Sequence, residues 1–251
     1  MIRVAESYEE LSLLAAGIVR DAIRARPDLV LGLPTGRTPL GLYAELVRMH
    51  RTGTLDLSGV TTFNLDEYYP MDSNDPRSFH QFMRKHFFDL VNVSAERIHV
   101  PDGSDPDPAR ACARYETELS EAGGLDLVIL GIGRNGHIGF NEPGTAFHTR
   151  TRLVELTEDT IIANFGRKGA DTPRFALSMG VATIMESRNV LLLASGPDKS
   201  RIMREALFGA IAVRVPASVL QTHPSVTVVM DREAAAACGS EMDLPGVVSA
   251  G

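Results

Sequence analysis

Three polar side chains within one glycine-rich stretch have the types and spacing needed for proton-transfer chemistry. The stretch covers residues 130–144, LGIGRNGHIGFNEPG, and holds Asn135, His137 and Glu142 among five glycines. An imidazole titrates near neutral pH, a carboxylate can orient it, and an amide can donate or accept a hydrogen bond. Glycine also lets the backbone approach a ligand closely, so the stretch predicts a catalytic loop.

Two other interpretations of this stretch stay open. Residues 131–136 fit GxGxxG, but a dinucleotide fold requires a helix directly after the glycines, and Pro143 and Gly144 oppose a long helix here. The plainer alternative is an ordinary strand-to-loop turn with a buried structural histidine.

A second glycine turn has the features of a phosphate site. Residues 34–39, PTGRTP, follow the apolar run 29–33 and precede a helical stripe of apolar residues. Thr38 is expected to cap this helix, with Pro39 at its first position. Free backbone N–H groups at a helix N-terminus favour a phosphate, although a plain strand-to-helix connection is equally compatible.

Charged candidates lie after two further segments that are predicted to be strands. Asp66 and Glu67 follow the segment 60–64, and Lys199 follows the segment 189–194. By themselves, adjacent carboxylates are common on solvated turns, and a lysine is more often a solvated helix residue. Their position after strand ends is what makes them candidates.

The elements that position these residues alternate along the chain. Strands are predicted at 2–5, 29–33, 60–64, 98–100, 125–130, 150–156, 189–194 and 226–230. Helices are predicted from the Ser7 cap, from Pro39, over 78–91, within 107–121, near 158–164 and up to 208. This order predicts an α/β fold: one domain, 1–251, with a mainly parallel, open, Rossmann-like sheet and helices on both faces.

Ligands of such sheets bind beyond the carboxyl ends of the strands. The turn 34–39, Asp66, the loop 131–144 and Lys199 should therefore meet on one rim. The segment 165–173, FGRKGADTP, is predicted to be a mobile loop, and the tail 239–251 is predicted to be poorly ordered.

Composition narrows the class of protein. With 44% hydrophobic and 23% charged residues, the 251-residue chain has the profile of a globular protein. A net charge of −7 argues against nucleic-acid or membrane-surface partners. Two cysteines give no disulfide framework, no metal-binding spacing occurs, and neither a signal peptide nor a membrane span is predicted. We therefore expect a cytoplasmic protein without metal or cofactor.

The pattern GxGxNGHIGFNEPG resembles the signature of the glucosamine-6-phosphate deaminases, also called glucosamine-6-phosphate isomerases. Further segments resemble that family in the same order: GLPTGRTPLGLY at 32–43, TFNLDEYY at 62–69, SFHQFMRKHFFD at 78–89 and PASVLQTHP at 216–224. The resemblance implies a hydrolase of amino-sugar catabolism. Its reaction would convert glucosamine 6-phosphate and water into fructose 6-phosphate and ammonia by ring opening and aldose–ketose isomerisation.

The resemblance also implies roles for single residues. His137 would open the sugar ring, Glu142 and Asn135 would orient its imidazole, and Asp66 would move a proton from C2 to C1. The residues matched to the phosphate site are Thr35, Gly36, Thr38, Lys199 and Arg167. Arg167 is the least direct match, because the usual arginine position falls on Gly166.

Departures from the family pattern and rival families qualify this interpretation. Asn135 stands where some members carry Asp, and Val154 replaces a lysine of the allosteric site, of which Arg152 is retained. We expect that site to be absent or crippled, and an oligomer is possible but not implied. A 6-phosphogluconolactonase is disfavoured, because GxDGHxxSLFPG and Asp-Glu-Arg are missing. A galactosamine-6-phosphate deaminase and a sugar-phosphate sensor domain remain alternatives.

Overall fold

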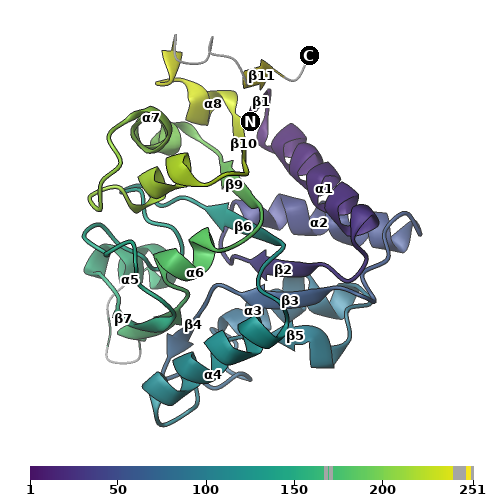
Figure 1. Ribbon diagram of the computed structural model, residues 1–251, viewed down its shortest axis with the longest axis vertical. Helices are drawn as coiled ribbons and strands as arrows, with labels where there is room; N and C mark the ends of the chain where they lie inside the picture. The colour runs from purple at the N-terminus through teal and green to yellow at the C-terminus, as the bar shows by residue number, and fades with distance from the viewer. Residues whose placement is uncertain (167–168, 170–171, 240–246, 250–251) are drawn as a thin grey trace.

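A parallel sheet forms the centre of the molecule. The computed structural model describes residues 1–166, 169, 172–239 and 247–249. Over these residues the main sheet has eight strands, in the order β11-β1-β10-β9-β6-β2-β3-β5, and each neighbouring pair is parallel (Figure 1). The predicted α/β class with a mainly parallel sheet is confirmed.

The strands of this sheet are β1 (Ile2–Ala5), β2 (Val30–Leu33), β3 (Thr61–Asn64), β5 (Ile98–His99), β6 (Leu127–Gly131), β9 (Val190–Ala194), β10 (Val226–Asp231) and β11 (Val247–Ser249). The first seven agree with the predicted strands to within a few residues. β11 lies inside the tail that was expected to be poorly ordered, and most of that tail, 240–246 and 250–251, lies outside the described residues.

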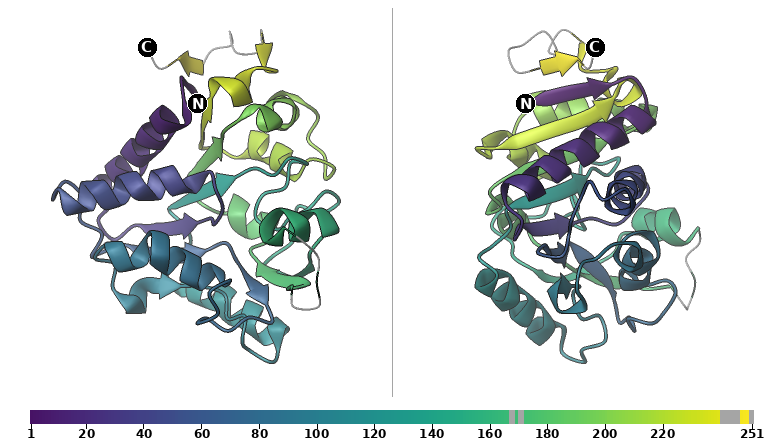
Figure 2. Two further views of the ribbon diagram at one scale, coloured as in Figure 1. Left: turned by 180° about the vertical axis from the view of Figure 1, so that it is seen from behind. Right: turned by 90° about the vertical axis from the view of Figure 1, so that its right-hand side faces the viewer.

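Helices cover both faces of the sheet because its strands are apolar on both sides. Successive residues of a strand point to opposite faces, so Leu31 and Leu33 join one core cluster while Val30 joins the other. The first face carries α1 (Tyr8–Ala25), α2 (Pro39–Arg51) and α3 (Phe79–His86), seen in front in the left view of Figure 2. The second carries α4 (Pro108–Glu121), α6 (Val181–Met185), α7 (Ser200–Phe208) and α8 (Arg232–Ala235).

A separate three-stranded antiparallel sheet was not predicted. It has the order β4-β8-β7, with β4 (Asp66–Tyr69), β8 (Phe175–Ser178) and β7 (Arg152–Glu155). A small apolar cluster packs beneath it and includes Ile161 of α5 (Glu158–Phe165). The segment 150–156 was predicted as a strand, but neither its sheet nor β8 was.

Two local predictions were wrong. The helix predicted over 78–91 ends at His86, because Phe87 leaves helical geometry at φ −147° and only a short 3-10 turn, Phe88–Leu90, follows. Thr38 makes no side-chain cap, since its own backbone is already helical (φ −59°, ψ −43°). Instead the Tyr8 hydroxyl of α1 accepts a hydrogen bond from Gly41 N at 2.7 Å.

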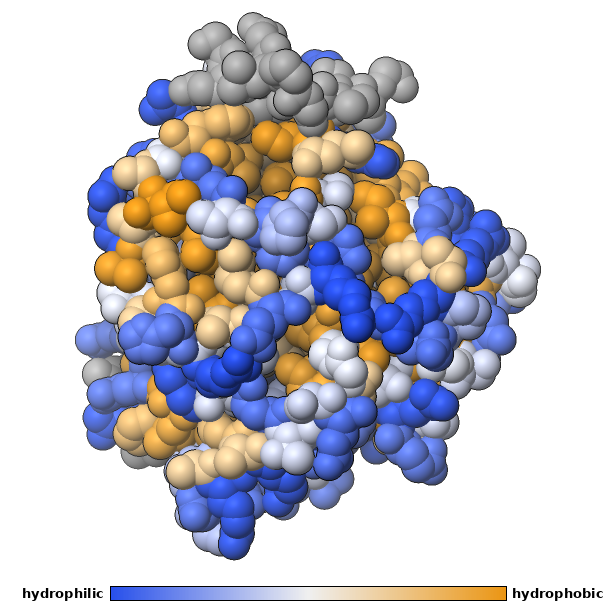
Figure 3. All heavy atoms as spheres, in the orientation of Figure 1, coloured by the Kyte–Doolittle hydropathy of each residue, from blue (hydrophilic) through white to orange (hydrophobic). Residues whose placement is uncertain are grey.

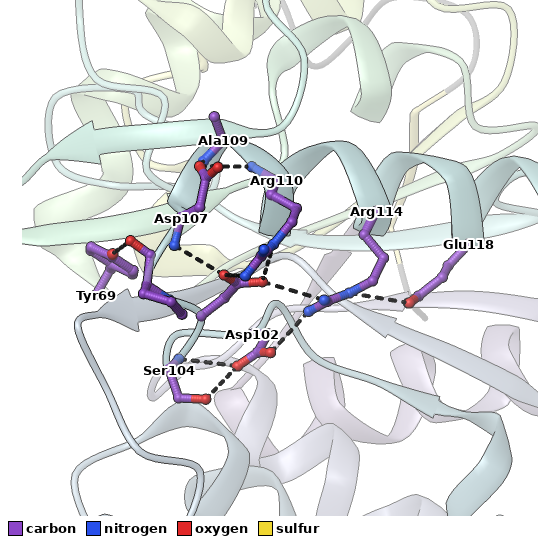
Figure 4. Close-up of polar contacts among 10 residues, drawn as sticks. Tyr69, Asp102, Ser104, Asp107, Ala109, Arg110, Arg114 and Glu118 are labelled. Atoms are coloured by element: carbon purple, nitrogen blue, oxygen red, sulfur yellow. Dashed lines mark hydrogen bonds and ion pairs between the residues drawn. The ribbon is translucent and has the colours of Figure 1, made fainter.

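Aspartate side chains fix the loop that precedes α4 through a helix cap and ion pairs with arginines. Asp107 caps the helix by accepting from Ala109 N and Arg110 N, at 3.0 and 3.1 Å (Figure 4). The buried Asp105 carboxylate accepts from Arg110 Nη2 at 2.6 Å and from Arg114 Nη1 at 3.3 Å. Hydrophilic residues dominate the lower half of the face seen in Figure 3, where α4 lies.

Candidate active site

Four adjacent strands end where the predicted site residues begin. Asp66 follows β3, the turn 34–39 follows β2, the loop 131–144 follows β6, and Lys199 follows β9. These strands are parallel neighbours in the order β9-β6-β2-β3, so their carboxyl ends lie at one edge of the sheet. The topology thus brings all four stretches to the same rim.

The loop 131–144 folds tightly around the His137 imidazole. Gly133 N donates to His137 O at 2.9 Å, and Gly136 N donates to Gly133 O at 3.0 Å. A Cβ atom added to Gly133 would lie 2.2 Å from His137 Cε1. Residue 133 must therefore be glycine for the ring to occupy this place.

Glu142 faces the imidazole and is fixed on both of its oxygens. Its Oε1 lies 3.4 Å from the buried His137 Nδ1, a contact that is too long for a good hydrogen bond. Oε2 accepts from Asn135 Nδ2 at 2.6 Å, and Oε1 accepts from Thr160 Oγ1 at 2.8 Å. Asn135 Oδ1 accepts from His137 N at 3.2 Å. Asn135 therefore contacts Glu142 and the backbone rather than the ring.

The charge of Glu142 is strongly favoured. Burial alone would raise the pKa of its carboxyl, but His137 and the hydrogen bonds from Thr160 and Asn135 lower that pKa to about 2. An ionised Glu142 favours a hydrogen on Nδ1 of His137, which leaves Nε2 able to accept a proton.

Asp66 is the first residue of β4 and approaches the same loop. Its side chain is buried, with 6% of the residue exposed. A Cβ atom on Gly139 would lie 3.6 Å from Asp66 Oδ2, and Gly139 itself has φ +55°. Burial, and then the neighbouring Glu67 carboxylate, raise the pKa of Asp66 to about 8. A carboxyl in this state can exchange a proton near neutral pH.

Glu67 has a role that its sequence context did not reveal. It is 3% exposed, so the solvated turn considered as an alternative is wrong. Its carboxylate accepts from Tyr68 N at 2.8 Å and from Phe79 N and His80 N at 2.9 Å each, which ties β4 to the start of α3. Burial raises the pKa of Glu67 to about 7 against these three donors. In the sequence, this role is indicated only by the predicted helix start at residue 78, whose free backbone N–H groups need an acceptor.

The phosphate candidates lie on either side of the loop 131–144. Thr35 and Thr38 are half-buried, and Gly36 is exposed with φ +112°. Lys199 ends the 3-10 turn η3 (Pro197–Lys199), and burial lowers the pKa of its amine. An ion pair of 2.8 Å between Arg134 Nε and Asp198 Oδ2 holds this turn beside the loop. Arg167 lies outside the described residues.

Two buried tyrosines that were not predicted to take part fix the strand ends of the site. Tyr43 of α2 donates to Pro34 O at 2.6 Å, and Tyr115 of α4 donates to Asn64 O at 2.6 Å. Burial, and then the Asp66 carboxylate, raise the pKa of both phenols. These bonds hold the carboxyl ends of β2 and β3 from opposite faces of the sheet.

Comparisons with known proteins agree with this arrangement. The family model for glucosamine-6-phosphate isomerases and 6-phosphogluconolactonase matches residues 4–229. A protein of Halothermothrix orenii named glucosamine-6-phosphate deaminase is 49% identical over 236 residues, covering 93% of this chain and 98% of its own. Glucosamine-6-phosphate deaminase 2 of Bacillus subtilis is 49% identical over 238 residues, with 93% and 96% covered.

Solved structures give the same result. The structure of a monomeric glucosamine-6-phosphate deaminase superposes with a TM-score of 0.91 at 45% identity, covering 94% of this chain and 99% of its own. A 6-phosphogluconolactonase from Trypanosoma cruzi, at 19% identity and a TM-score of 0.76 with 94% and 95% covered, shares the fold alone. The chain belongs to the glucosamine-6-phosphate isomerase and 6-phosphogluconolactonase family.

Proposed function

We propose that this protein is a glucosamine-6-phosphate deaminase, which converts glucosamine 6-phosphate and water into fructose 6-phosphate and ammonia. The observation that carries the proposal is the pairing of a buried Asp66 with a His137–Glu142 couple at one rim of the sheet. Relatives that are 47–49% identical over more than nine-tenths of the chain bear this name.

Ring opening is the task of His137. The Nε2 atom takes the proton of the anomeric hydroxyl and returns a proton to the ring oxygen, while Nδ1 stays turned toward Glu142. Because Glu142 is ionised, it stabilises the imidazolium formed between the two transfers.

Isomerisation is the task of Asp66. Its carboxylate removes the proton from C2 to give an enolamine and delivers that proton to C1, which leaves an imine at C2. Water then adds to C2, and ammonia departs. A buried carboxylate with a pKa near 8 is basic enough for this exchange at neutral pH. Since water cleaves a C–N bond, we class the enzyme as a hydrolase.

The 6-phosphate is assigned to the backbone of the turn 34–39 and to Lys199. Gly36 is exposed, and its neighbours precede a helix N-terminus whose dipole favours an anion. No helix in the described part of the chain is long and apolar enough to cross a membrane. We place the enzyme in the cytoplasm, because a phosphorylated sugar is too polar to cross a lipid bilayer unaided.

Product analysis tests this proposal. The purified protein is given glucosamine 6-phosphate, and ammonia and fructose 6-phosphate are measured together, with galactosamine 6-phosphate and 6-phosphogluconolactone in parallel. We expect equal amounts of both products from glucosamine 6-phosphate. Lactone hydrolysis without ammonia would refute the deaminase assignment, and turnover of the galactosamine compound alone would correct the epimer.

Substitution of the base tests the role of Asp66 directly. Asp66→Asn keeps the shape of the side chain but removes its basicity, so turnover should fall by about a thousandfold or more while substrate binding persists. Binding is followed by calorimetry with glucosamine 6-phosphate. Substantial residual ammonia release from the variant would contradict the base assignment.

A further inference from the structure

A threonine of α5 reaches the carboxylate of Glu142 from outside the catalytic loop. Thr160 is buried, and its Oγ1 donates to Glu142 Oε1 at 2.8 Å. Thr157, the cap of α5, accepts from Thr160 N at 3.2 Å and donates from its own Oγ1 to Thr160 Oγ1 at 2.9 Å. Two hydroxyls therefore form a chain of hydrogen bonds that runs from the helix cap to the carboxylate.

The contacted oxygen decides what this bond does. Oε1 is the atom of Glu142 that faces His137 Nδ1, at 3.4 Å, whereas Oε2 is held by Asn135. Without the threonine hydroxyl, Oε1 would keep, among the described residues, only this long contact with the ring, and Asn135 alone would donate a hydrogen bond to the carboxylate. The hydroxyl thus fixes the oxygen on which the orientation of the imidazole depends.

The acceptor of this hydroxyl also argues for a specific task. Thr160 lies in the first turn of α5, and its hydroxyl hydrogen goes to the Glu142 carboxylate, which makes a stronger bond than a neutral acceptor would.

We propose that Thr160 is a positioning residue, through which the placement of α5 controls the His137–Glu142 couple. The inference rests on the proposed function, because ring opening is the step that this couple serves. When the α5 N-terminus is in place, Glu142 Oε1 is directed at Nδ1, and His137 holds the tautomer that ring opening needs. Displacement of α5 would release that oxygen and slow ring opening, while Asp66 on β4 keeps its place.

Two matched substitutions separate the hydroxyl from the packing. Thr160→Val keeps the branched shape and loses the hydroxyl, whereas Thr160→Ser keeps the hydroxyl and loses a methyl group. We expect kcat of Thr160→Val to fall by about tenfold or more with little change in KM, and Thr160→Ser to retain most activity. Equal losses in both variants, or wild-type kcat in Thr160→Val, would overturn the proposal.

The isotope effect at C2 distinguishes slower ring opening from a general disturbance of the site. With glucosamine 6-phosphate deuterated at C2, Thr160→Val should show a smaller isotope effect on kcat than the wild type, because ring opening becomes limiting. Thr160→Ser should retain the wild-type effect. An unchanged isotope effect in Thr160→Val would contradict a role in ring opening.

Ring nitrogen NMR tests the positioning without any substrate. In protein labelled with ¹⁵N-histidine, with His137→Asn for assignment, the wild type and Thr160→Ser should show the Nδ1–H tautomer of neutral His137. Thr160→Val should show a mixture of tautomers. Identical spectra for all three proteins would overturn the inference even if the enzyme is an active deaminase. Conversely, a tautomer shift in a protein that releases no ammonia would refute only the proposed function.

Discussion

At the scale of single residues, the site separates two carboxyls by their surroundings. Glu142 receives hydrogen bonds from Asn135 and Thr160 and faces an imidazole, so its pKa falls to about 2. Asp66 is buried beside another carboxyl, and its pKa rises to about 8. Two carboxyl groups whose surroundings shift their pKa values in opposite directions can take different roles in catalysis. Glu142 is a permanent charge, and Asp66 is a group that gains and loses a proton.

The raised pKa of Asp66 predicts the acid limb of the rate profile. The base must be ionised to take the C2 proton, so kcat/KM should rise with pH toward about 8, far above the range of an ordinary aspartate. Glu67→Gln removes the neighbouring carboxylate, and the limb should move to lower pH. Steady-state kinetics at constant ionic strength measure both profiles, and thermal melting verifies that the variant is folded. A wild-type limb near pH 4 would show that the pKa of Asp66 is not raised in the free enzyme.

A glycine pair tests the packing of the imidazole. In Gly133→Ala the new Cβ would lie 2.2 Å from His137 Cε1, so the ring must leave its place, and kcat should fall by about a hundredfold or more. Gly131→Ala is the matched control, because its Cβ would have no neighbour within 4 Å. Circular dichroism confirms folding of both proteins. Comparable activity of the two variants would mean that His137 does not act from the observed position.

At the scale of elements, the site is assembled by parallel strands that are neighbours in the sheet but far apart in the sequence. β9, β6, β2 and β3 are adjacent, and each ends in one of the stretches that form the site. Tyr43 and Tyr115 then hold the ends of β2 and β3 from helices on opposite faces. Asp66 differs from the other candidates, since it belongs to a strand of the small sheet, where it lies opposite Ser178.

The elements also mark the limit of prediction from sequence. Apolar runs and caps such as Ser7 are local signals, and they predicted the parallel strands other than β11 and most of the longer helices. The loop 131–144 was predicted because its glycines and polar residues are contiguous. β8 and Thr160 were missed, since strand pairing in the small sheet and a bond across 18 residues depend on three-dimensional contact rather than spacing. Glu67 was underestimated for the same reason.

The ion pairs of Asp105 in the loop before α4 can be tested by their effect on stability. Asp105→Asn weakens the bonds from Arg110 and Arg114 that are drawn in Figure 4, so the melting temperature at pH 7 should fall. The hydrogen bond from Arg110 lowers the pKa of Asp105. Its contribution is therefore present above the ordinary aspartate pKa and is lost as pH falls below it.

The difference in melting temperature between the variant and the wild type should accordingly shrink as pH falls below the ordinary aspartate pKa, and it should vanish once the Asp105 carboxylate of the folded protein is protonated. Asp89→Asn, which disrupts the exposed pair with Arg84, is the control and should change melting very little. A difference between wild type and Asp105→Asn that is independent of pH would point to packing rather than to charge.

At the scale of the whole molecule, the acidic chain meets an anionic substrate only locally. The net charge is −7, yet Arg134, Lys199 and the start of α2 follow the carboxyl ends of β6, β9 and β2, at one edge of the sheet. Arg134 is paired with Asp198, so the positive potential depends on Lys199 and on backbone N–H groups. We therefore infer that affinity for the sugar phosphate comes from the rim itself and not from the field of the whole protein.

The whole molecule should also respond to substrate without cooperativity. The residue matched to Arg152 is expected to bind the activator in allosterically regulated members of the family. Here the half-buried Arg152 guanidinium donates to Asn141 Oδ1 at 2.8 Å and so holds the catalytic loop from within the chain. Val154 supplies no charge where the family pattern has a lysine. An effector site built on these residues would lack one cation and would have to displace the other from the loop.

We therefore expect a hyperbolic rate curve that N-acetylglucosamine 6-phosphate leaves unchanged. Initial rates across a range of glucosamine 6-phosphate concentrations, with and without that compound, measure this. A sigmoidal curve that the compound makes hyperbolic would mean that Arg152 leaves Asn141 to bind an effector, and that the loop is regulated after all.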